Sequence, residues 1–367
     1  MGKLLSMKIN KTTENLWDLF LNSETNFKNY IPKKPIKNNS ILVTGSTGFL
    51  GIHLLKKLIE SKMYDKIYAI ARNKNKVQQQ IQYYQLNEIG FNNIIWIEGD
   101  ILDLEENMFP EVEYIIHSAA QIHTLKNIHQ LWKDNIETTN KLVKIYQNQK
   151  LFFISTLSVF VSSNQLGNHE EKYIPINSEY EIYGGYAQSK WICEKIVENY
   201  QKNIIRIGLL TGDSEKGIFP KDFFTTFIKI NQELKIYPES FEEAYVDITP
   251  VDFCIQEIKK YLMCSKKSPI LHIANQTAYP LSEIIKLLQL KKVDKNIWME
   301  EIQKFSNIEK KLLEFAYYKK DSLQKYFQYM NVDLFQSTNH FYNSQKKFSK
   351  LNNDLVKLYI QKMSNCA

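Results

Sequence analysis

The sequence has few cysteines and histidines, and neither type shows the spacing of a metal site. Its four cysteines are scattered over 367 residues, too few for a disulfide framework. This usage is typical of a reducing compartment, so we expect a cytoplasmic protein. The seven histidines are also dispersed and include no His-Glu-x-x-His motif. We therefore predict that the chain binds no metal ion.

Long apolar runs and a strong excess of one charge are lacking too. No run approaches 18 apolar residues, and the first ten residues lack a signal-peptide core, so no transmembrane segment is predicted. The first six residues, MGKLLS, match the N-myristoylation pattern, but so short a match is weak evidence. The net charge of +7 is spread along the chain. Because nucleic-acid-binding motifs are missing as well, we do not expect a nucleic acid partner.

Short apolar runs recur from residue 41 onward. They predict β-strands at residues 41–43, 66–70, 93–97, 112–116, 151–154 and 204–207, and helices at 54–59, 78–85, 128–147 and 186–200. Strands that alternate with helices at this spacing are typical of βαβ units. The sequence therefore predicts an α/β fold with a Rossmann-type, doubly wound parallel sheet.

Composition divides the chain into three stretches. Residues 1–39 form a polar, lysine-rich lead with one amphipathic helix around Leu16, Leu19 and Phe20, followed by a linker. Residues 40–245 are expected to form the nucleotide-binding domain with the catalytic residues. Residues 246–367 are expected to form a smaller, mostly helical substrate-binding part. Its predicted helices span 250–263, 281–290, 298–315 and 351–363, with one strand at 270–273.

A glycine-rich turn follows the first predicted strand. Gly45 would allow a tight turn, Gly48 would let the backbone approach a pyrophosphate, and Gly51 would let the helix lie close to the strand. The helix N-terminus then offers N–H groups and a positive dipole end to a phosphate. An ordinary strand-to-helix turn is the alternative. The predicted cofactor residues of this turn are Gly45, Ser46, Thr47, Gly48, Phe49, Leu50 and Gly51.

Arginine is rare in this chain. Of the 47 basic residues, only Arg72 and Arg206 are arginines. Arg72 ends the second predicted strand, where a carboxylate would bind a ribose 2′-hydroxyl and an arginine suits a 2′-phosphate. A guanidinium binds phosphate through a planar fork that lysine lacks. We therefore predict NADPH as the cofactor, with a plain surface arginine as the alternative.

Two further strand ends carry candidate cofactor residues. Asp100 and Ile101 follow the third predicted strand, where the carboxylate of Asp100 could accept from the adenine amino group or could simply cap the loop. Ala119 and Ala120 follow the fourth predicted strand, and such small residues would let the backbone run beside the cofactor. His117 is interpreted as an ordinary hydrogen-bonded histidine.

Three polar residues are candidates for catalysis. Thr156 ends the fifth predicted strand, and Tyr186 and Lys190 follow at the start of a helix, where positions i and i+4 share one face. Hydride reduction of a carbonyl creates an oxyanion that a tyrosine hydroxyl can protonate. A nearby ammonium lowers the tyrosine pKa, and the threonine hydroxyl adds a hydrogen bond. Tyr186 and Lys190 would also contact the cofactor. The alternative is a helix start with a solvated lysine.

Together these motifs resemble an extended short-chain dehydrogenase/reductase. The individual residues of these motifs are similar to those of the thioester reductase branch, which is related to fatty acyl-CoA and carboxylic acid reductases. The resemblance covers about residues 40–290. Its most specific segment reads GYAQSKWICE at 185–194, and RIGLLTGDS at 206–214 fits as well. This resemblance implies NADPH-dependent reduction of an acyl thioester, bound to CoA or a carrier protein, to an aldehyde and in some members to an alcohol. Thr156, Tyr186 and Lys190 match the family's catalytic positions, and Gly45, Gly48, Gly51 and Arg72 match its cofactor positions.

The sequence departs from the family pattern at two places. The usual Arg-Pro-Gly reads RIG at 206–208, and the usual Asn-Val-x-Gly-Thr reads NIETT at 135–139. Asn135 is kept, but threonine replaces the glycine at 138, which we expect to alter helix packing behind the site. No phosphopantetheine attachment motif precedes residue 40, so a carrier protein is expected to act in trans.

Two other functions stay open. The same fold would serve a nucleotide-sugar or sterol-like epimerase or dehydrogenase, although the Ser-Lys-Trp wording at 189–191 argues against it. A non-catalytic NADPH-binding protein is the other alternative. Such a protein can lose the tyrosine or the lysine, and this chain keeps both.

Overall fold

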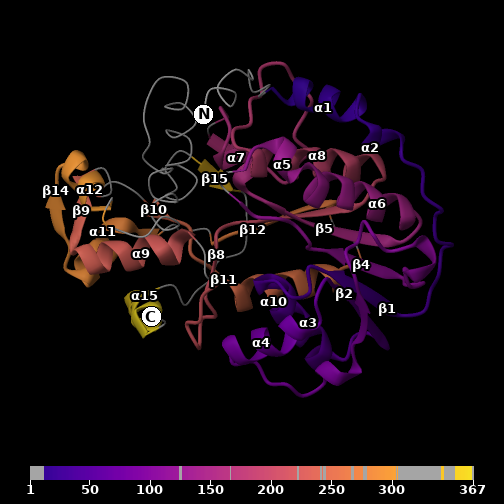
Figure 1. Ribbon diagram of the computed structural model, residues 1–367, viewed down its shortest axis with the longest axis horizontal. Coiled ribbons are helices and arrows are strands. Elements are labelled where there is room, and N and C mark those ends of the chain that lie inside the picture. Colours follow the sequence, from indigo (N-terminus) through magenta and orange to yellow (C-terminus); the bar gives the residue numbers. More distant parts are fainter. Residues whose placement is uncertain are drawn as a thin grey trace.

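The structure, a computed structural model, describes residues 12–123, 126–165, 167–220, 223–239, 242, 245–265, 268–275, 279–302, 304, 340–342 and 352–365. A larger part built on a central sheet lies beside a smaller helical part (Figure 1). The N-myristoylation pattern at residues 1–6 lies outside the described residues. So do residue 303 and residues 305–315 of the helix that we predicted over 298–315.

A seven-stranded parallel sheet forms the centre of the larger part, in the order β12-β7-β5-β4-β1-β2-β3. This confirms the predicted Rossmann-type α/β fold. The strands are β1 (Ser40–Thr44), β2 (Lys66–Ala71), β3 (Ile95–Glu98), β4 (Tyr114–His117), β5 (Lys150–Thr156), β7 (Asn203–Ile207) and β12 (Ile270–Ile273).

The seventh strand comes from a stretch that the sequence pattern assigned to the smaller part. Ile270–Ile273 pairs in parallel with Ile204–Ile207 and is buried along its whole length. Four consecutive buried residues fit a strand that is covered on both faces. The sheet therefore extends past residue 245, the boundary that composition suggested.

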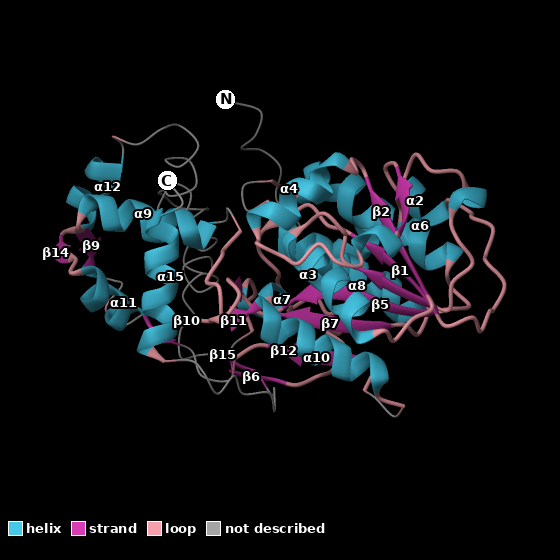
Figure 2. Cartoon of the chain, turned by 90° about the horizontal axis from the view of Figure 1, so that it is seen from below, coloured by secondary structure: helices cyan, strands magenta, loops and turns pink. Residues whose placement is uncertain are grey.

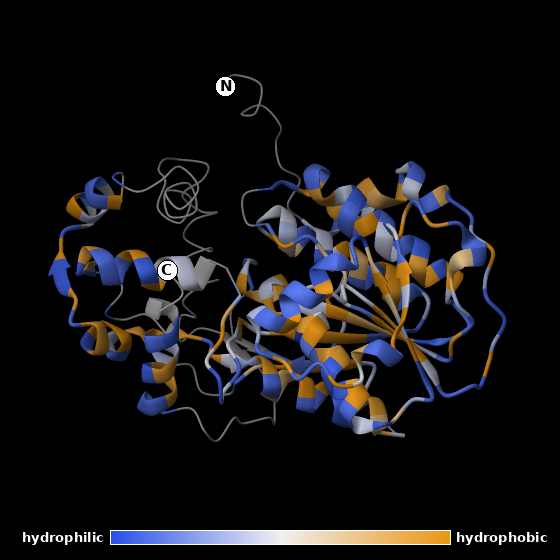
Figure 3. Cartoon of the chain, turned by 60° about the horizontal axis from the view of Figure 1, so that its bottom comes forward, coloured by the Kyte–Doolittle hydropathy of each residue, from blue (hydrophilic) through white to orange (hydrophobic). Residues whose placement is uncertain are grey.

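Helices cover both faces of the sheet (Figure 1). One face carries α3 (Phe49–Ser61), α4 (Asn75–Tyr83) and α10 (Val251–Met263), and the other carries α1 (Thr13–Leu21), α5 (Ile128–Leu131), α6 (Thr138–Ile145) and α8 (Gly185–Asn199). Because successive strand residues point to opposite faces, Phe153 packs into the cluster under α8, whereas Phe152 and Ile154 pack under α3 and α10. Figure 3 shows the hydrophobic strands enclosed between these helices.

The helix predicted over 128–147 is not continuous. A π-helical stretch, Trp132–Glu137, separates α5 from α6. Thr138, which stands where the family has glycine, donates its hydroxyl to the carbonyl of Lys133, five residues earlier. This contact spans the wide turn that a π-helical stretch makes. The helix behind the candidate site therefore differs from the regular helix that the sequence predicted.

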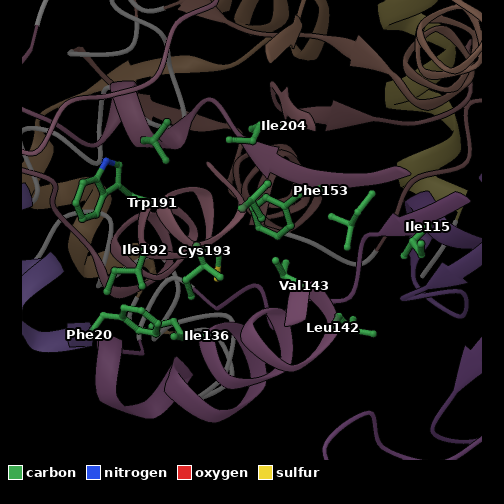
Figure 4. Close-up of a cluster of buried hydrophobic side chains, with 14 of the residues drawn as sticks. Phe20, Ile115, Ile136, Leu142, Val143, Phe153, Trp191, Ile192, Cys193 and Ile204 are labelled. Atoms are coloured by element: carbon green, nitrogen blue, oxygen red, sulfur yellow. The ribbon is translucent and has the colours of Figure 1, made fainter. Parts of the chain in front are cut away.

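The amphipathic helix predicted in the N-terminal lead is confirmed as α1. Its residues Leu16, Trp17 and Phe20 are buried in the same core cluster as α8 residues. Figure 4 shows Phe20 in this cluster with Ile136 and Ile192. The segment therefore forms part of the larger unit's core. A short helix, α2 (Glu24–Phe27), follows it, and residues 28–37 then cross to β1 without regular structure.

The smaller part is mostly helical (Figure 2). It has a hydrophobic core of its own. Its helices are α9 (Phe223–Leu234), α11 (Leu281–Leu288), α12 (Lys295–Ile302) and α15 (Asn353–Asn365), and its short strand pairs are β9 (Ile236–Pro238) with β14 (Lys291–Val293) and β10 (Tyr245–Val246) with β13 (Tyr279–Pro280). Trp298 and Tyr359 are buried at its centre. The Tyr359 hydroxyl donates to the carbonyl of Gly212 at 2.7 Å, which anchors α15 to the connection between the two parts.

The remaining described elements are short. They are α7 (Ser158–Val161), β6 (Gly167–His169) paired with β15 (His340–Tyr342), β8 (Leu210–Thr211) paired with β11 (Thr249–Pro250), and 3₁₀ turns at Phe91–Asn93 and Glu106–Met108. Among the described residues, no helix has the length and apolar character needed to cross a bilayer. The same residues contain no group of three or more histidine, cysteine or acidic side chains that could hold a metal ion.

Candidate active site

The predicted site residues gather where the parallel strands end. The carboxyl ends of β1, β2, β3, β4 and β5 share one edge of the sheet, which is where open α/β sheets bind their ligands. Thr44, Ala71, Glu98, His117 and Thr156 close these five strands. The fold therefore brings segments far apart in the sequence to the same edge.

The glycine-rich turn packs tightly against the end of β4. Gly45 has a φ of +68°, and a Cβ there would lie 2.7 Å from the backbone nitrogen of Ala119. A Cβ on Gly51 would lie 2.1 Å from the carbonyl oxygen of Gly45, so α3 can begin this close to the turn only with glycine. A Cβ on Gly48 would meet only that same oxygen among the described atoms, at 3.2 Å. The geometry fits the three separate roles predicted for these glycines.

Ser46 and Phe49 of this turn direct their side chains to the protein. The buried hydroxyl of Ser46 donates to the carbonyl of Ile70 at 2.6 Å, which ties the turn to β2. The Phe49 ring lies 4.9 Å from His53 and 5.1 Å from Tyr84 between ring centres. At this turn, therefore, the groups suited to phosphate are backbone N–H groups at the start of α3 rather than the side chain of Ser46.

Arg72 lies at the end of β2 with three-quarters of its side chain exposed. Its Nη1 atom is 3.9 Å from Oδ2 of Asp100 and 3.8 Å from Oδ1 of Asp134. Asp100 also accepts from the backbone nitrogen of Leu102 at 3.0 Å, so the loop-capping interpretation holds for one of its oxygens. Ile101 is buried beneath this loop. Asp134 was not among the site residues predicted from the sequence.

A buried hydrogen-bond chain runs behind the end of β4. The Thr139 hydroxyl donates to the carbonyl of Asn135 at 2.7 Å and therefore accepts from Nε2 of His117 at 3.0 Å. Nδ1 of His117 then accepts from the Thr44 hydroxyl at 2.8 Å, and Thr44 accepts from the backbone nitrogen of Ala119. Burial lowers the pKa of His117 to about 3, with a contribution from Lys190. His117 is thus a neutral, satisfied histidine, as interpreted from the sequence.

Thr156, Tyr186 and Lys190 meet near the middle of this edge. The hydroxyl of Thr156 contacts that of Ser158 at 3.0 Å and also shares a hydrogen bond with Tyr186. Tyr186 lies in the first turn of α8 and stays partly accessible, whereas Lys190 is buried one turn later. The pKa of Tyr186 is raised above its ordinary value by burial, although the hydrogen bond with Thr156 opposes this. The prediction that the Lys190 ammonium lowers this pKa is wrong for the free protein, because Lys190 donates to the backbone of β5 instead. Burial therefore keeps the phenol protonated, so that it can donate a proton.

Lys190 points to the backbone of β5. Its Nζ donates to the carbonyl of Ile154 at 2.6 Å and lies 4.1 Å from the centre of the Phe153 ring. Burial lowers the pKa of this lysine to about 8, while Cys193 and Glu194 raise it. The ammonium is therefore held next to the strand that carries Thr156.

Asn135 joins the loop after β4 to the helix that carries Tyr186. Its Oδ1 accepts from the backbone nitrogen of Gln121 at 2.7 Å, and its Nδ2 donates to the hydroxyl of Ser189 at 2.9 Å. Its carbonyl also accepts from the thiol of Cys193 at 3.4 Å. Despite the change to threonine at position 138, this asparagine makes contacts on both sides.

A buried ion pair supports the site and was not predicted. Arg206 donates from Nε to Oε1 of Glu194 at 2.9 Å and from Nη2 to Oε2 at 2.7 Å. Ser155, directly before Thr156, donates its hydroxyl to the same Oε1 at 2.6 Å. Nη1 of Arg206 donates to the carbonyl of Lys172 and to Nε2 of His272. The rarity of arginine was the signal that could have drawn attention to position 206.

Comparisons with known proteins match this architecture. The family model described as male sterility protein matches residues 43–258. Isonitrile lipopeptide synthase from Streptomyces coeruleorubidus is 26% identical over 264 residues, covering 66% of this chain and 18% of that protein. One of the linear gramicidin synthase proteins of Brevibacillus parabrevis is 28% identical over 301 residues, covering 73% and 6% respectively. The chain thus spans less than a fifth of the length of these two relatives.

Solved structures share the fold across nearly the whole chain. The terminal R domain from the myxalamid PKS-NRPS biosynthetic pathway has a TM-score of 0.74 at 23% identity, covering 92% of this chain and 93% of that one. A thiolation-reductase di-domain from an archaeal non-ribosomal peptide synthetase has a TM-score of 0.69 at 21% identity, covering 97% and 79%.

The parallel sheet, the glycine-rich turn and the tyrosine–lysine helix define an NAD(P)-binding oxidoreductase of the extended short-chain dehydrogenase/reductase class. The family model covers more than half of the sequence, so the chain belongs to the male sterility protein family. The R domain and the thiolation-reductase di-domain among the solved structures agree with the thioester reductase-like branch that the sequence motifs resemble.

Proposed function

We propose that this protein reduces an acyl thioester, bound to a carrier protein or to CoA, to an aldehyde with NADPH as the reductant. One observation carries the proposal. The hydroxyls of Thr156 and Tyr186 share a hydrogen bond at the sheet edge that also holds the glycine-rich turn, with Lys190 one helical turn away. A proton donor, a second hydroxyl and a cation beside a nucleotide-binding turn are the groups that carbonyl reduction needs.

The residues at this edge fit a dinucleotide. The outer side of Gly48 is open, and the start of α3 presents N–H groups of the kind that bind a pyrophosphate. Arg72 would hold the 2′-phosphate, Asp100 and Ile101 the adenine, and Ala119 and Ala120 would line the path to the nicotinamide. When bound, NADPH supplies a hydride to the carbonyl carbon of the substrate.

Three side chains would do the remaining chemistry. The Thr156 hydroxyl donates a hydrogen bond to the substrate carbonyl oxygen and helps to stabilise the negative charge that develops there. Tyr186, kept protonated by burial, donates its proton to that oxygen. The ammonium of Lys190 favours the phenolate that remains and contacts the nicotinamide ribose. Loss of the thiol from the resulting hemithioacetal would give the aldehyde.

The thioester substrate is proposed from the relatives. One matched structure is a thiolation-reductase di-domain, and the two curated relatives named above are synthases of a lipopeptide and of linear gramicidin. Such proteins suggest a carrier-bound acyl or peptidyl thioester. We therefore propose that an acyl or peptidyl carrier protein presents the substrate to this site.

An epimerase also shares this scaffold. UDP-glucuronic acid 4-epimerase from Bacillus cereus has a TM-score of 0.56 at 22% identity and covers 70% of this chain, against 0.74 and 92% for the R domain. The longer structural match includes the smaller helical part and favours the reductase. Assays with an acyl thioester and with a UDP-sugar would separate the two functions.

The Tyr186→Phe variant tests the proposed chemistry. It removes the proton donor and keeps the ring, so NADPH oxidation with a panel of acyl-CoAs and carrier-bound thioesters should fall by orders of magnitude while NADPH binding is retained. Tyr200→Phe, at the far end of α8, is the matched control and should keep wild-type turnover. Unchanged turnover in Tyr186→Phe would remove this residue from the mechanism. Mass spectrometry of the products distinguishes aldehyde from alcohol, and cofactor binding without turnover on any substrate class would instead indicate a binding protein.

A further inference from the structure

The cation that we assign to the cofactor's 2′-phosphate is flanked by two carboxylates. Arg72 follows β2, Asp100 follows β3, and Asp134 lies in the π-helical stretch beyond β4, so three separate segments meet here. Nη1 of Arg72 lies within 4 Å of an oxygen of each aspartate. All three side chains are partly or largely exposed, which makes them accessible to a ligand.

The charged side chains around Arg72 do not all favour the binding of a phosphate. One guanidinium carries +1 and the two carboxylates together carry −2, and a 2′-phosphate would add further negative charge. The other arginine of the chain, Arg206, is fully buried in its pair with Glu194. A ribose that carries a free 2′-hydroxyl instead of a phosphate can donate a hydrogen bond to a carboxylate. The aspartates therefore oppose NADPH and tolerate NADH.

We propose that Asp134 is a specificity-determining residue that limits the preference for NADPH over NADH. Its carboxylate competes with the 2′-phosphate for the guanidinium of Arg72. Asp100 has a second function in the loop, because it accepts from the backbone nitrogen of Leu102. Asp134 is therefore the aspartate whose charge can be removed with the least effect on the loop after β3. This inference rests on the proposed function of Arg72 in cofactor binding.

Dissociation constants for NADPH and NADH, measured by cofactor fluorescence on the full chain, test the inference. In Asp134→Asn, the ratio of the NADH to the NADPH constant should rise about two- to fivefold, the range expected for an exposed charge pair. The rise should shrink in 0.5 M salt, because exposed charges are screened. It should also disappear in an Arg72→Gln background if the competition acts through Arg72.

Asp103→Asn is the matched control. It removes the same charge from an exposed position in the loop after β3, and its ratio should stay at the wild-type value. An unchanged or lower ratio in Asp134→Asn, with both cofactors still bound, would overturn this inference alone. An equal rise in Asp103→Asn would also overturn it, since the effect would then be one of general charge. If wild-type protein binds neither cofactor, the proposed function fails together with the inference.

Discussion

Arg206 and Glu194 meet through two parallel hydrogen bonds in a fully buried position between β7 and α8. Glu194 lies one helical turn after Lys190 and also accepts from Ser155, the neighbour of Thr156. Glu194 therefore links α8, which carries two candidate catalytic residues, to β7 through Arg206 and to β5 through Ser155. Its position predicts that it aligns β5 and α8.

Breaking this pair on one side should destabilise the fold strongly. Glu194→Leu leaves the guanidinium of Arg206 buried without its partner, which typically costs about 3–5 kcal/mol. Chemical denaturation would measure this loss. The Lys286→Met change in the exposed pair with Glu283 is the control and should cost less than about 1 kcal/mol. A loss as small as that of the control would show that the buried pair is not needed for stability.

Glycine at position 51 should be required by packing rather than by backbone conformation. Its Cβ position lies 2.1 Å from the Gly45 oxygen, so Gly51→Ala must push α3 away from the turn. We expect a loss of about 1–3 kcal/mol in unfolding free energy together with weaker cofactor binding.

The matched variant Gly48→Ala separates the two effects. Its Cβ would meet one neighbour at 3.2 Å, a smaller overlap than the 2.1 Å contact at Gly51, so stability should fall less than in Gly51→Ala. Cofactor affinity should fall because the added methyl group lies where the phosphate approaches. Thermal denaturation and cofactor titration on both variants check this. Equal stability of Gly51→Ala and wild type would contradict the packing argument.

The pH dependence of turnover should report on Lys190. Burial lowers the pKa of this lysine to about 8, so its ammonium is lost as the pH rises through that value, and kcat/KM should fall above about pH 8. Burial raises the pKa of Tyr186, so the phenol should stay protonated over the same range. Lys190→Arg keeps the charge at high pH and should remove the falling limb from whatever activity remains.

A loss of stability caused by Lys190 would not explain a fall in kcat/KM above pH 8. The pKa of Lys190 is lower in the folded chain than the ordinary value of 10.5, so between about pH 8 and 10.5 the unfolded chain binds more protons. The contribution of this lysine to stability therefore improves as the pH rises through that window. Denaturation curves at pH 8 and pH 10 would give the free energy of unfolding at each pH. Its change can then be compared with the expected fall in kcat/KM over the same range.

The sheet was predictable from sequence because most of its strands are buried on both faces and read as apolar runs, although the edge strand β3 is partly exposed. The glycine-rich turn was predictable too, since Gly45 is required by its positive φ and Gly51 by its contact with Gly45 within the turn itself. The helix with Tyr186 and Lys190 follows from a local four-residue spacing. Each of these features depends on short-range geometry that the order of residues expresses directly.

Other features depend on contacts between distant segments. The hydroxyl of Ser46 binds the backbone of β2, and Arg206 finds Glu194 only after β7 and α8 pack together. Asp134 contacts Arg72 although the two residues belong to segments far apart in the sequence. Asp134 lies in a π-helical stretch, which regular helical periodicity does not reveal. A single sequence contains no spacing rule for such pairs, so the supports of the site had to be observed.

The seventh strand has a practical consequence for the choice of fragments. The segment that matches the family model ends at residue 258 and starts at residue 43, inside β1, whereas β12 begins at Ile270. A fragment limited to that match would lack β12, so the apolar β7 would become an exposed edge strand of the sheet. It would also lack α1, which packs against α8. Exposed edge strands of this kind pair readily with other chains. Boundaries set by homology alone would therefore favour self-association over a working enzyme.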